Sequence, residues 1–335
     1  MILVTGATGL LGSHVLLEVL KTGRTVRALI RPQRNSACLQ SLYHWYGQDA
    51  ESLLQKVEWV VGDLLDLPSL ETALTGVDTV YHCAGMISFD PADEKQLLRI
   101  NWEGTRNLVD LCLELGVSEC CYVSSISVLN GNTAVQTESS EDTGSYSYGY
   151  AASKYLAEME VWRAGQEGLK ISIVNPGIII GPGPSWLGSG RFFVEVHKGL
   201  TYFPPGGTGF VGVYDVAQAM LTLMNKQVYG ERFILVAENL SFYEILGSIA
   251  KAMGVVSPSK KLRFWHLEVL WRLDFMRVLL GGKSRKLTKS TARSLRQIKQ
   301  YSSQKIIDAT GLKFQKIEDV IRSTAAFFSA QSVSE

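Results

Sequence analysis

The sequence predicts an α/β protein built on a doubly wound parallel sheet, followed by a smaller and mainly helical portion. Short apolar or β-branched runs alternate with amphipathic helical stretches through the first half, as βαβ units require. Beyond residue 177 this alternation gives way to Gly/Pro-rich loops and then to mostly helical patterns. We therefore expect one domain over residues 1–177, to which residues 211–240 could add strands, and a substrate-binding portion over residues 178–330.

The predicted elements of the first half follow one another in order. Strands are expected at Ile2–Val4, Thr25–Ile30, Val57–Val61, Thr79–His82, Cys120–Ser124 and Ile171–Asn175. Helices with apolar residues at helical spacing are expected at about Gly12–Lys21, Leu70–Leu74, Glu94–Leu115 and Tyr150–Glu167. Five crossovers of one hand would place these strands in a single sheet.

Composition and charge exclude several classes of protein. The 335 residues are 46% hydrophobic, enough to fill a sizeable core, and 33 Lys and Arg against 32 Asp and Glu leave a net charge of +1. This balance provides no electrostatic footprint for nucleic acid. The longest charge-free stretch, residues 171–190, is broken by three prolines and five glycines, so no transmembrane segment is expected.

The cysteines and the N-terminus bear on location. The five cysteines form an odd set without C-x-x-C spacing, which argues against a disulfide framework and against a metal site: Cys38, Cys83, Cys112, Cys120 and Cys121. Met1 leads directly into an apolar run and has no basic leader with a cleavage site. A cytoplasmic protein is the expectation.

A glycine-rich turn connects the first predicted strand to the first predicted helix. Its spacing is G-x-x-G-x-x-G, in which Gly6 would permit the tight turn, Gly9 would let the backbone approach a pyrophosphate, and Gly12 would let helix and strand pack closely. The helix N-terminus would offer free N–H donors. This context predicts a Rossmann-type dinucleotide site, formed here by Gly6, Thr8, Gly9, Leu10, Leu11 and Gly12.

The end of the second predicted strand bears on which dinucleotide binds. A carboxylate at this point suits the ribose 2′-hydroxyl of NAD, whereas an arginine suits the 2′-phosphate of NADP. The chain has Arg31 there, with Arg34 close behind it, and no acid. NADP(H) is therefore favoured, and NAD(H) remains the alternative if Arg31 is a solvated loop residue.

Three residues suggest acid–base chemistry. Tyr150 and Lys154 stand four positions apart, so they would be neighbours on one helix face. A cation beside a tyrosine favours the phenolate, and we expect Lys154 to move the pKa of Tyr150 towards neutrality. Ser125 follows a parallel strand, at the ligand-binding edge of the sheet, and could hydrogen-bond the same substrate oxygen.

In this order of motifs, the chain resembles the extended short-chain dehydrogenase/reductases over nearly its whole length. That superfamily includes sugar-nucleotide epimerases, 3β-hydroxysteroid dehydrogenases and dihydroflavonol-reductase-like enzymes. The resemblance is carried by TGATGLLG at Thr5–Gly12, Gly62-Asp63-Leu64, Tyr81-His82-Cys83-Ala84-Gly85, Asn101-x-x-Gly104-Thr105-x-Asn107, Val123-Ser124-Ser125, Tyr150-Ala-Ala-Ser-Lys154, and Asn175-Pro176-Gly177 followed by Gly181-Pro182-Gly183.

The resemblance implies roles for individual residues. It places Asp63 and Leu64 beside the adenine, Ala84 and Gly85 along the cofactor, and Pro176, Gly177 and Ile178 near the nicotinamide. It makes Ser125, rather than Ser124, the catalytic hydroxyl beside Tyr150, and it gives Lys154 a second contact with the nicotinamide ribose. It also implies a homodimer through residues 94–115 and 150–167. Asn101 is expected to be structural or part of a relay, and His82 to be packing.

The reaction stays open between alternatives. Family dehydratases carry an Asp-Glu pair after the catalytic hydroxyl, and this chain has Ile126-Ser127 there, so dehydration is disfavoured. Hydride transfer to or from a small carbonyl or alcohol is favoured. An epimerase with tightly bound NAD is the runner-up, with Arg191, Lys198 and Arg232 as cations for a diphosphate. A non-catalytic NADP(H) sensor or scaffold is a third possibility.

Two further features concern the second half. The candidate walls for an apolar substrate are Trp186, Phe192, Phe193, Tyr202 and Phe203. A basic stretch over residues 283–299 follows an aromatic run that includes Phe264, Trp265, Trp271 and Phe275. It could attract an anionic ligand or dock on a membrane surface, but a core-facing helix followed by a solvated basic helix is the favoured interpretation.

Overall fold

A seven-stranded parallel sheet forms the centre of the computed structural model, which describes residues 1–33, 36–129, 131, 133–140, 149–279 and 288–332. The strand order is β11-β7-β5-β4-β1-β2-β3. Their bounds are β1 (Ile2–Thr5), β2 (Val26–Ile30), β3 (Val57–Val61), β4 (Thr79–His82), β5 (Glu119–Val123), β7 (Lys170–Pro176) and β11 (Glu231–Leu235). The order reverses direction beside β1, as in a doubly wound sheet, so the predicted fold class is confirmed.

Burial on both faces explains why these runs form strands. Every residue of β1, β2 and β4 is buried, because helices cover both sides of a parallel sheet, and such strands are apolar without alternation. The six predicted strands are all present, with small shifts at their ends. The seventh strand, β11, comes from residues 231–235 and pairs with β7 through register Phe233 to Val174.

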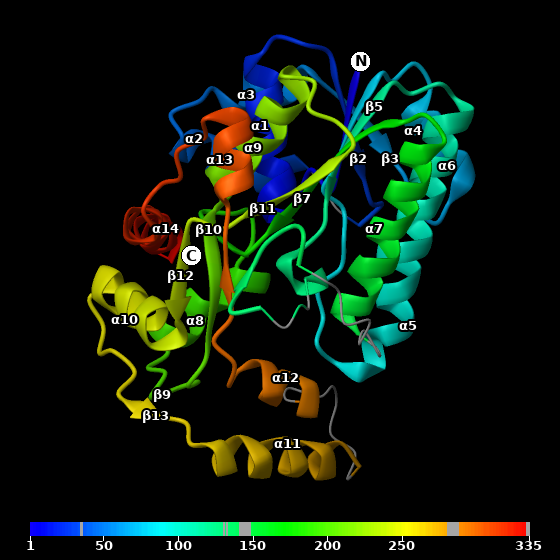
Figure 1. Ribbon diagram of the computed structural model, residues 1–335. Helices are drawn as coiled ribbons and strands as arrows, with labels where there is room; N and C mark the ends of the chain where they lie inside the picture. The colour runs from blue at the N-terminus through cyan, green and yellow to red at the C-terminus, as the bar shows by residue number, and fades with distance from the viewer. Residues whose placement is uncertain (34–35, 130, 132, 141–148, 280–287, 333–335) are drawn as a thin grey trace.

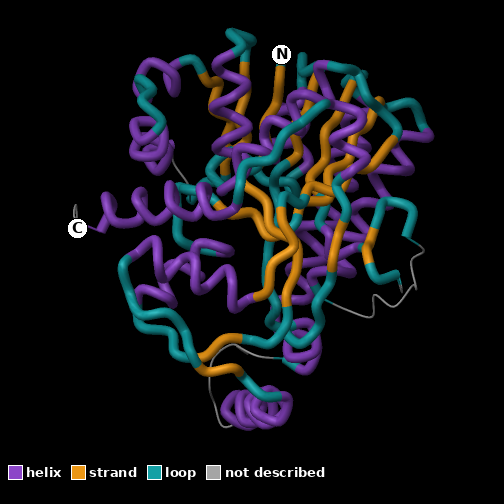
Figure 2. Tube along the Cα trace, turned by 60° about the vertical axis from the view of Figure 1, so that its left-hand side comes forward, coloured by secondary structure: helices purple, strands orange, loops and turns teal. Residues whose placement is uncertain are grey.

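Helices cover the two faces of the sheet (Figure 1). On one face α1 (Leu10–Lys21) packs against α9 (Val213–Asn225), and on the other α6 (Gly104–Glu114) packs against α4 (Leu67–Leu74) and α7 (Tyr150–Gln166). Each pairing buries its own apolar core against the strands. Figure 2 shows the strands lying between these helices. The short helices α2 (Gln40–Trp45) and α3 (Ala50–Gln55), which the sequence analysis missed, connect β2 to β3.

The predicted helix over residues 94–115 is interrupted. It consists of α5 (Glu94–Leu97), a π-helical turn over Leu98–Glu103 and then α6. A π turn adds a residue to the helical repeat and commonly lies at a functional site. Here it turns Asn101 inward, where its side chain is buried.

The second half of the chain contains a small sheet that the sequence analysis did not foresee. Its order is β12-β10-β8, with β8 (Ile178–Ile180), β10 (Gly207–Gly212) and β12 (Glu238–Ser241). Three helices bury an apolar cluster against it: α8 (Arg191–His197), α10 (Phe242–Met253) and α14 (Ile317–Ser332). The remaining elements are β6 (Val135–Gln136), β9 (Tyr202–Phe203), β13 (Lys260–Lys261), β14 (Gln300–Tyr301), α11 (Phe264–Leu279), α12 (Lys289–Ser294) and α13 (Gln304–Thr310).

The aromatic run before the basic stretch faces the core on one side of α11 only, through Leu267 and the half-buried Trp271, so the favoured interpretation holds for that side alone. Trp265 is 57% exposed and Phe275 43% exposed on α11, because this helix packs mainly against α12 and lies at the edge of the molecule (Figures 1 and 2). Among the basic residues, Lys283, Arg285 and Lys286 lie outside the described residues. Within the described part of the chain, no helix is both long and apolar enough to span a bilayer.

Close approach of two backbones at Gly177 joins the two sheets. A Cβ there would lie 2.4 Å from the Gly209 carbonyl oxygen, whereas a Cβ at Gly247, inside α10, would meet nothing within 4 Å. We expect Gly177→Ala to lower the free energy of unfolding by about 1–3 kcal/mol. The control Gly247→Ala should raise it by about 0.5–1 kcal/mol, because alanine favours the helix. Urea unfolding measures both, and equal effects would contradict the packing described.

Candidate active site

The glycine turn between β1 and α1 has no room for side chains. Gly6 has a φ of +68°, and a Cβ on it would lie 2.7 Å from the Ala84 nitrogen. A Cβ on Gly12 would lie 2.1 Å from the Gly6 carbonyl oxygen. The exposed Gly9 caps α1 without a side chain, which leaves the first-turn N–H groups at Leu10, Leu11 and Gly12 available to an anion. Thr8 is half-buried in the same turn.

The next two strand ends carry the residues expected around the adenosine. Arg31 follows β2 and is exposed, whereas Arg34 lies outside the described residues. After β3, the Asp63 carboxylate accepts the Leu65 N–H at 3.0 Å, and its own N–H donates to Ser69 Oγ at 3.2 Å. The carbonyl of the buried Leu64 accepts Asn107 Nδ2 at 3.0 Å. These bonds hold the loop at the carboxyl edge of the sheet.

His82, the last residue of β4, holds the end of this strand in place through hydrogen bonds of both its ring nitrogens. Thr5 Oγ1 lies 2.7 Å from His82 Nδ1 and accepts the Ala84 N–H at 3.2 Å. His82 Nε2 lies 3.0 Å from Thr105 Oγ1. Burial lowers the pKa of His82 to about 3, with a smaller contribution from the Lys154 charge, so the ring is neutral at pH 7. His82 is therefore a packed and fully bonded side chain, and its hydrogen bonds place Ala84 against the glycine turn.

Asn101 connects the loop after β4 to the start of α7. Its Oδ1 accepts the Met86 N–H at 2.7 Å, and its Nδ2 donates to Met86 O at 3.0 Å and to Ser153 Oγ at 2.9 Å. Ser153 Oγ in turn donates to the Tyr150 carbonyl oxygen at 2.8 Å. A Cβ on Gly85 would lie 3.4 Å from Asn101 Oδ1, so the loop passes close beneath this amide.

The structure brings Ser125, Tyr150 and Lys154 together. Tyr150 is the first residue of α7, and Ser125 follows β5, close enough to the Tyr150 hydroxyl to oppose a rise in its pKa. The Lys154 ammonium donates to the Val123 carbonyl oxygen at 2.6 Å and lies 4.4 Å from the centre of the Tyr122 ring. The end of β5 and the N-terminus of α7 thus converge at the carboxyl edge of the sheet, where α/β proteins bind ligands.

The pKa values of this group differ from the sequence expectation. Burial raises the pKa of Tyr150 above its ordinary value, and the hydrogen bond with Ser125 opposes that rise. The expectation that Lys154 brings the tyrosine towards neutrality is therefore wrong for the chain by itself. Burial also lowers the pKa of Lys154 to about 7, against the opposing charge of Glu158, because the ammonium is costly to desolvate.

A buried carboxylate that the sequence analysis missed lies one turn beyond Lys154. Glu158 is fully buried and accepts Ser124 Oγ at 2.5 Å and Asn175 Nδ2 at 2.9 Å on one oxygen. Its other oxygen lies 3.2 Å from Arg232 Nη1 and accepts Trp162 Nε1 at 3.3 Å. Only the i+4 spacing from Lys154 hinted at this residue. Its partners on the sheet lie on β7, on β11 and directly after β5, so it fastens α7 to three neighbouring segments of the sheet.

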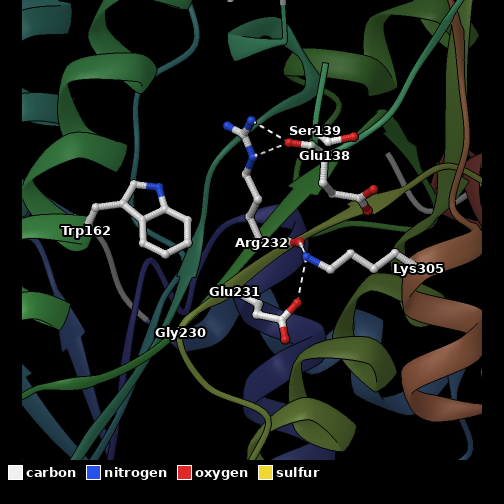
Figure 3. Close-up of a pocket in the computed structure, with 7 residues that line it drawn as sticks. All are labelled: Glu138, Ser139, Trp162, Gly230, Glu231, Arg232 and Lys305. Atoms are coloured by element: carbon white, nitrogen blue, oxygen red, sulfur yellow. Dashed lines mark hydrogen bonds and ion pairs between the residues drawn. The ribbon is translucent and has the colours of Figure 1, made fainter. Parts of the chain in front are cut away.

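Arg232 is consequently bonded to groups of the protein itself. Its guanidinium also donates to the Glu138 carbonyl oxygen at 2.7 and 3.1 Å, and Lys305 pairs with Glu231 at 2.7 Å (Figure 3). The surface cavity around these residues is lined by Glu138, Ser139, Trp162, Gly230, Glu231, Arg232 and Lys305, and none of the proposed catalytic residues lines it. Arg191 and Lys198, the other two candidate cations, are exposed on and after α8.

The predicted apolar walls are mostly core. Trp186 stacks against Phe327 and Phe328 of α14, and Phe193 and Phe203 belong to the apolar cluster of the small sheet. Phe192 packs against that cluster and Tyr202 is 45% exposed. The aromatic ring that does meet the site is Phe89, whose centre lies 6.0 Å from that of Tyr150. Phe89 was not expected at the site from the sequence, although the apolar run after Gly85 was a signal.

The residues that the sequence predicts beside the nicotinamide lie at the C-terminal end of β7 and directly after it. Pro176 ends that strand, Gly177 donates its N–H to Leu235 O at 3.0 Å, and Ile178 opens β8 beside Phe210. The side chain of Asn175, just before Pro176, also donates to Ser125 O at 3.2 Å. The strand end is therefore joined to the loop that carries Ser125.

The fold and these motifs define an NAD(P)-dependent enzyme of the extended short-chain dehydrogenase/reductase type. The family described as "Male sterility protein", an NAD-binding family, matches residues 4–202, which is more than half of the chain. The chain therefore belongs to this family.

Named relatives and a solved structure agree with that membership. Sterol demethylase protein B of Methylococcus capsulatus is 32% identical over 262 residues, which cover 76% of this chain and 75% of that protein. Anthocyanidin reductase of Arabidopsis thaliana is 29% identical over 269 residues, covering 72% and 77% of the two chains. The crystal structure of gox2253 is similar with a TM-score of 0.80 and 28% identity, over 99% of this chain and 98% of that one.

Proposed function

We propose that the protein reduces a carbonyl group, or oxidises the matching alcohol, of a small apolar substrate with NADP(H), using Tyr150 as the acid and base. The observation that carries this proposal is the convergence of Ser125, at the end of β5, with Tyr150 and the buried Lys154, in the first two turns of α7, at the carboxyl edge of the sheet. With its pKa raised, Tyr150 is protonated at neutral pH and carries the proton that a carbonyl oxygen takes up on reduction. The reductase name of one relative supports the same chemistry.

The residues present suit a dinucleotide. A Cβ at Gly6 or Gly12 would collide with backbone, so the turn is shaped for a group that approaches the main chain, and the N-terminus of α1 suits a pyrophosphate. When bound, the nicotinamide supplies or accepts the hydride. Arg31, exposed at the end of β2, would bind a 2′-phosphate through charge-assisted hydrogen bonds.

Residues of the chain then transfer the proton that accompanies the hydride. Tyr150 would give its hydroxyl proton to the carbonyl oxygen during reduction and take a proton from the alcohol during oxidation. Ser125 would hold the same oxygen and stabilise the charge that develops on it. Lys154, with a pKa lowered to about 7, could accept and return a proton near neutrality as well as hold a ribose hydroxyl.

The surroundings of Tyr150 support an apolar substrate. Phe89 meets the tyrosine ring edge-on while 63% exposed, and Ile87 on the same loop is 62% exposed. Exposed apolar side chains beside a reactive hydroxyl suit an aromatic or aliphatic carbonyl compound. A sugar diphosphate would require cations, and Arg232 is already bonded to Glu158. The reductase therefore fits better than the epimerase.

Removal of the Tyr150 hydroxyl tests this role. We expect Tyr150→Phe to lower kcat for carbonyl reduction by roughly a hundredfold or more, because the general acid is lost. The Tyr150→Phe variant should still bind NADPH, and a fluorescence titration measures this binding. The control Tyr155→Phe, on the same helix, should keep its activity. A Tyr150→Phe enzyme as active as wild type would refute the assignment.

The cofactor preference has its own test. We expect Arg31→Ala to raise the KM for NADPH by about tenfold and to leave that for NADH nearly unchanged, because a charge-assisted hydrogen bond to the 2′-phosphate is lost. The exposed Arg322→Ala on α14 is the matched control and should change neither value. Equal losses with both cofactors would show that Arg31 does not select the phosphate.

A further inference from the structure

Helix α11 presents an apolar stripe to solvent. With about 100° of rotation per residue, Trp265, Val269, Leu273 and Met276 fall within one narrow sector of the helix. Their exposed fractions are 57%, 43%, 54% and 55%. Exposed apolar surface of this extent on a helix marks an interaction site rather than an ordinary surface.

The opposite side of α11 already faces the protein. Leu267 is 1% exposed and Trp271 is half-buried, and both lie on the far side of the helix from the stripe. The helix thus has two apolar sides, one towards α12 and one outward. The outward stripe is therefore separate from the side of α11 that packs against the protein.

Basic residues flank the stripe and extend beyond it. Arg272 and Arg277 lie on its two edges, and Lys261, Arg263, Lys289 and Arg293 are exposed on neighbouring parts of the chain. Both acids of the helix are already paired within it, Glu268 with Arg272 at 2.7 Å and Asp274 with Arg277 at 2.9 Å.

The charge of this segment is opposite to that of the rest of the chain. Residues 260–299 hold 12 of the 33 Lys and Arg but only 2 of the 32 Asp and Glu, a net charge of +10 that leaves −9 for all other residues. An almost neutral protein therefore carries its excess positive charge in the one segment of its sequence that contains α11. This pattern is typical of helices that lie in the interface of an anionic bilayer.

We propose that α11 docks the protein on a membrane surface that carries anionic lipids. The stripe of Trp265, Val269, Leu273 and Met276 enters the acyl boundary, while the flanking arginines and the basic residues of α12 contact the headgroups. The helix lies at the end of the molecule towards which the parallel strands run (Figure 1). Docking would turn the strand ends that carry Ser125 and Val123 towards the lipid.

Vesicle flotation with the full-length protein tests this inference. Vesicles of phosphatidylcholine alone are compared with vesicles that also contain roughly a third phosphatidylglycerol, at about 0.1 M and about 1 M salt. We expect binding to the anionic vesicles at low salt only. Leu273→Glu and Val269→Glu should each lower the bound fraction about tenfold, because each places a charge in the apolar boundary.

Two matched variants separate the apolar and the electrostatic contributions. Leu115→Glu changes a 37% exposed leucine at the end of α6 and should bind as wild type does. Lys289→Gln with Arg293→Gln should weaken binding to anionic vesicles and flatten its salt dependence. Circular dichroism confirms that each variant is folded.

Three outcomes would overturn the inference. One is a wild-type protein that binds neither kind of vesicle, and another is binding that Leu273→Glu leaves intact. The third is a dimer in solution, measured by light scattering, that Leu273→Glu converts to a monomer, because a second copy of the chain would then cover the stripe. These results do not depend on the proposed hydride transfer, since no activity is measured.

Discussion

The geometry of this protein depends on one buried carboxylate. Glu158 accepts hydrogen bonds from Ser124 on the loop after β5 and from Asn175 on β7, and it pairs with Arg232 on β11. A charge in this position is stable only when paired and fully bonded, so α7 has a single orientation on the sheet. One turn earlier on the same helix, Lys154 reaches the Val123 carbonyl, and one further turn earlier Tyr150 meets Ser125.

Two other polar connections complete this arrangement from the cofactor side. A buried chain of hydrogen bonds joins Thr5, His82 and Thr105 and holds Ala84 close to Gly6. Asn101 joins the loop that follows to Ser153. The glycine turn and the segments that carry Ser125 and Tyr150 consequently belong to one hydrogen-bonded edge of the sheet. Positioning of this kind brings reacting groups together before the reaction begins. The exposed apolar side chains of Ile87 and Phe89 lie on the loop between the two, and Phe89 contacts the Tyr150 ring.

Much of the fold was predictable from the sequence because parallel strands buried on both faces are continuous apolar runs, and a glycine-rich turn between strand and helix is typical of a dinucleotide-binding unit. The small sheet of β8, β10 and β12 was not, since its strands are short and its partners are distant in the chain. The role of Glu158 arises only in three dimensions, where three strands meet one helix. The pKa of Tyr150 was predicted with the wrong sign, because the spacing of Tyr150 and Lys154 does not reveal the burial that raises it. The outward stripe of α11 could not be predicted from the sequence, because that helix is apolar on two sides and the sequence does not show which side is buried.

The most direct test of how this edge of the sheet is held together is the titration of Lys154 by NMR in protein carrying ¹³C-labelled lysine, with the signal assigned from a Lys154→Arg variant. Burial should bring the pKa of the ammonium to about 7, and Glu158→Gln should lower it further, because the Glu158 charge opposes the effect of burial. A wild-type pKa near the ordinary 10.5 of lysine, unchanged in Glu158→Gln, would contradict the claim that the carboxylate and the buried lysine organise this edge.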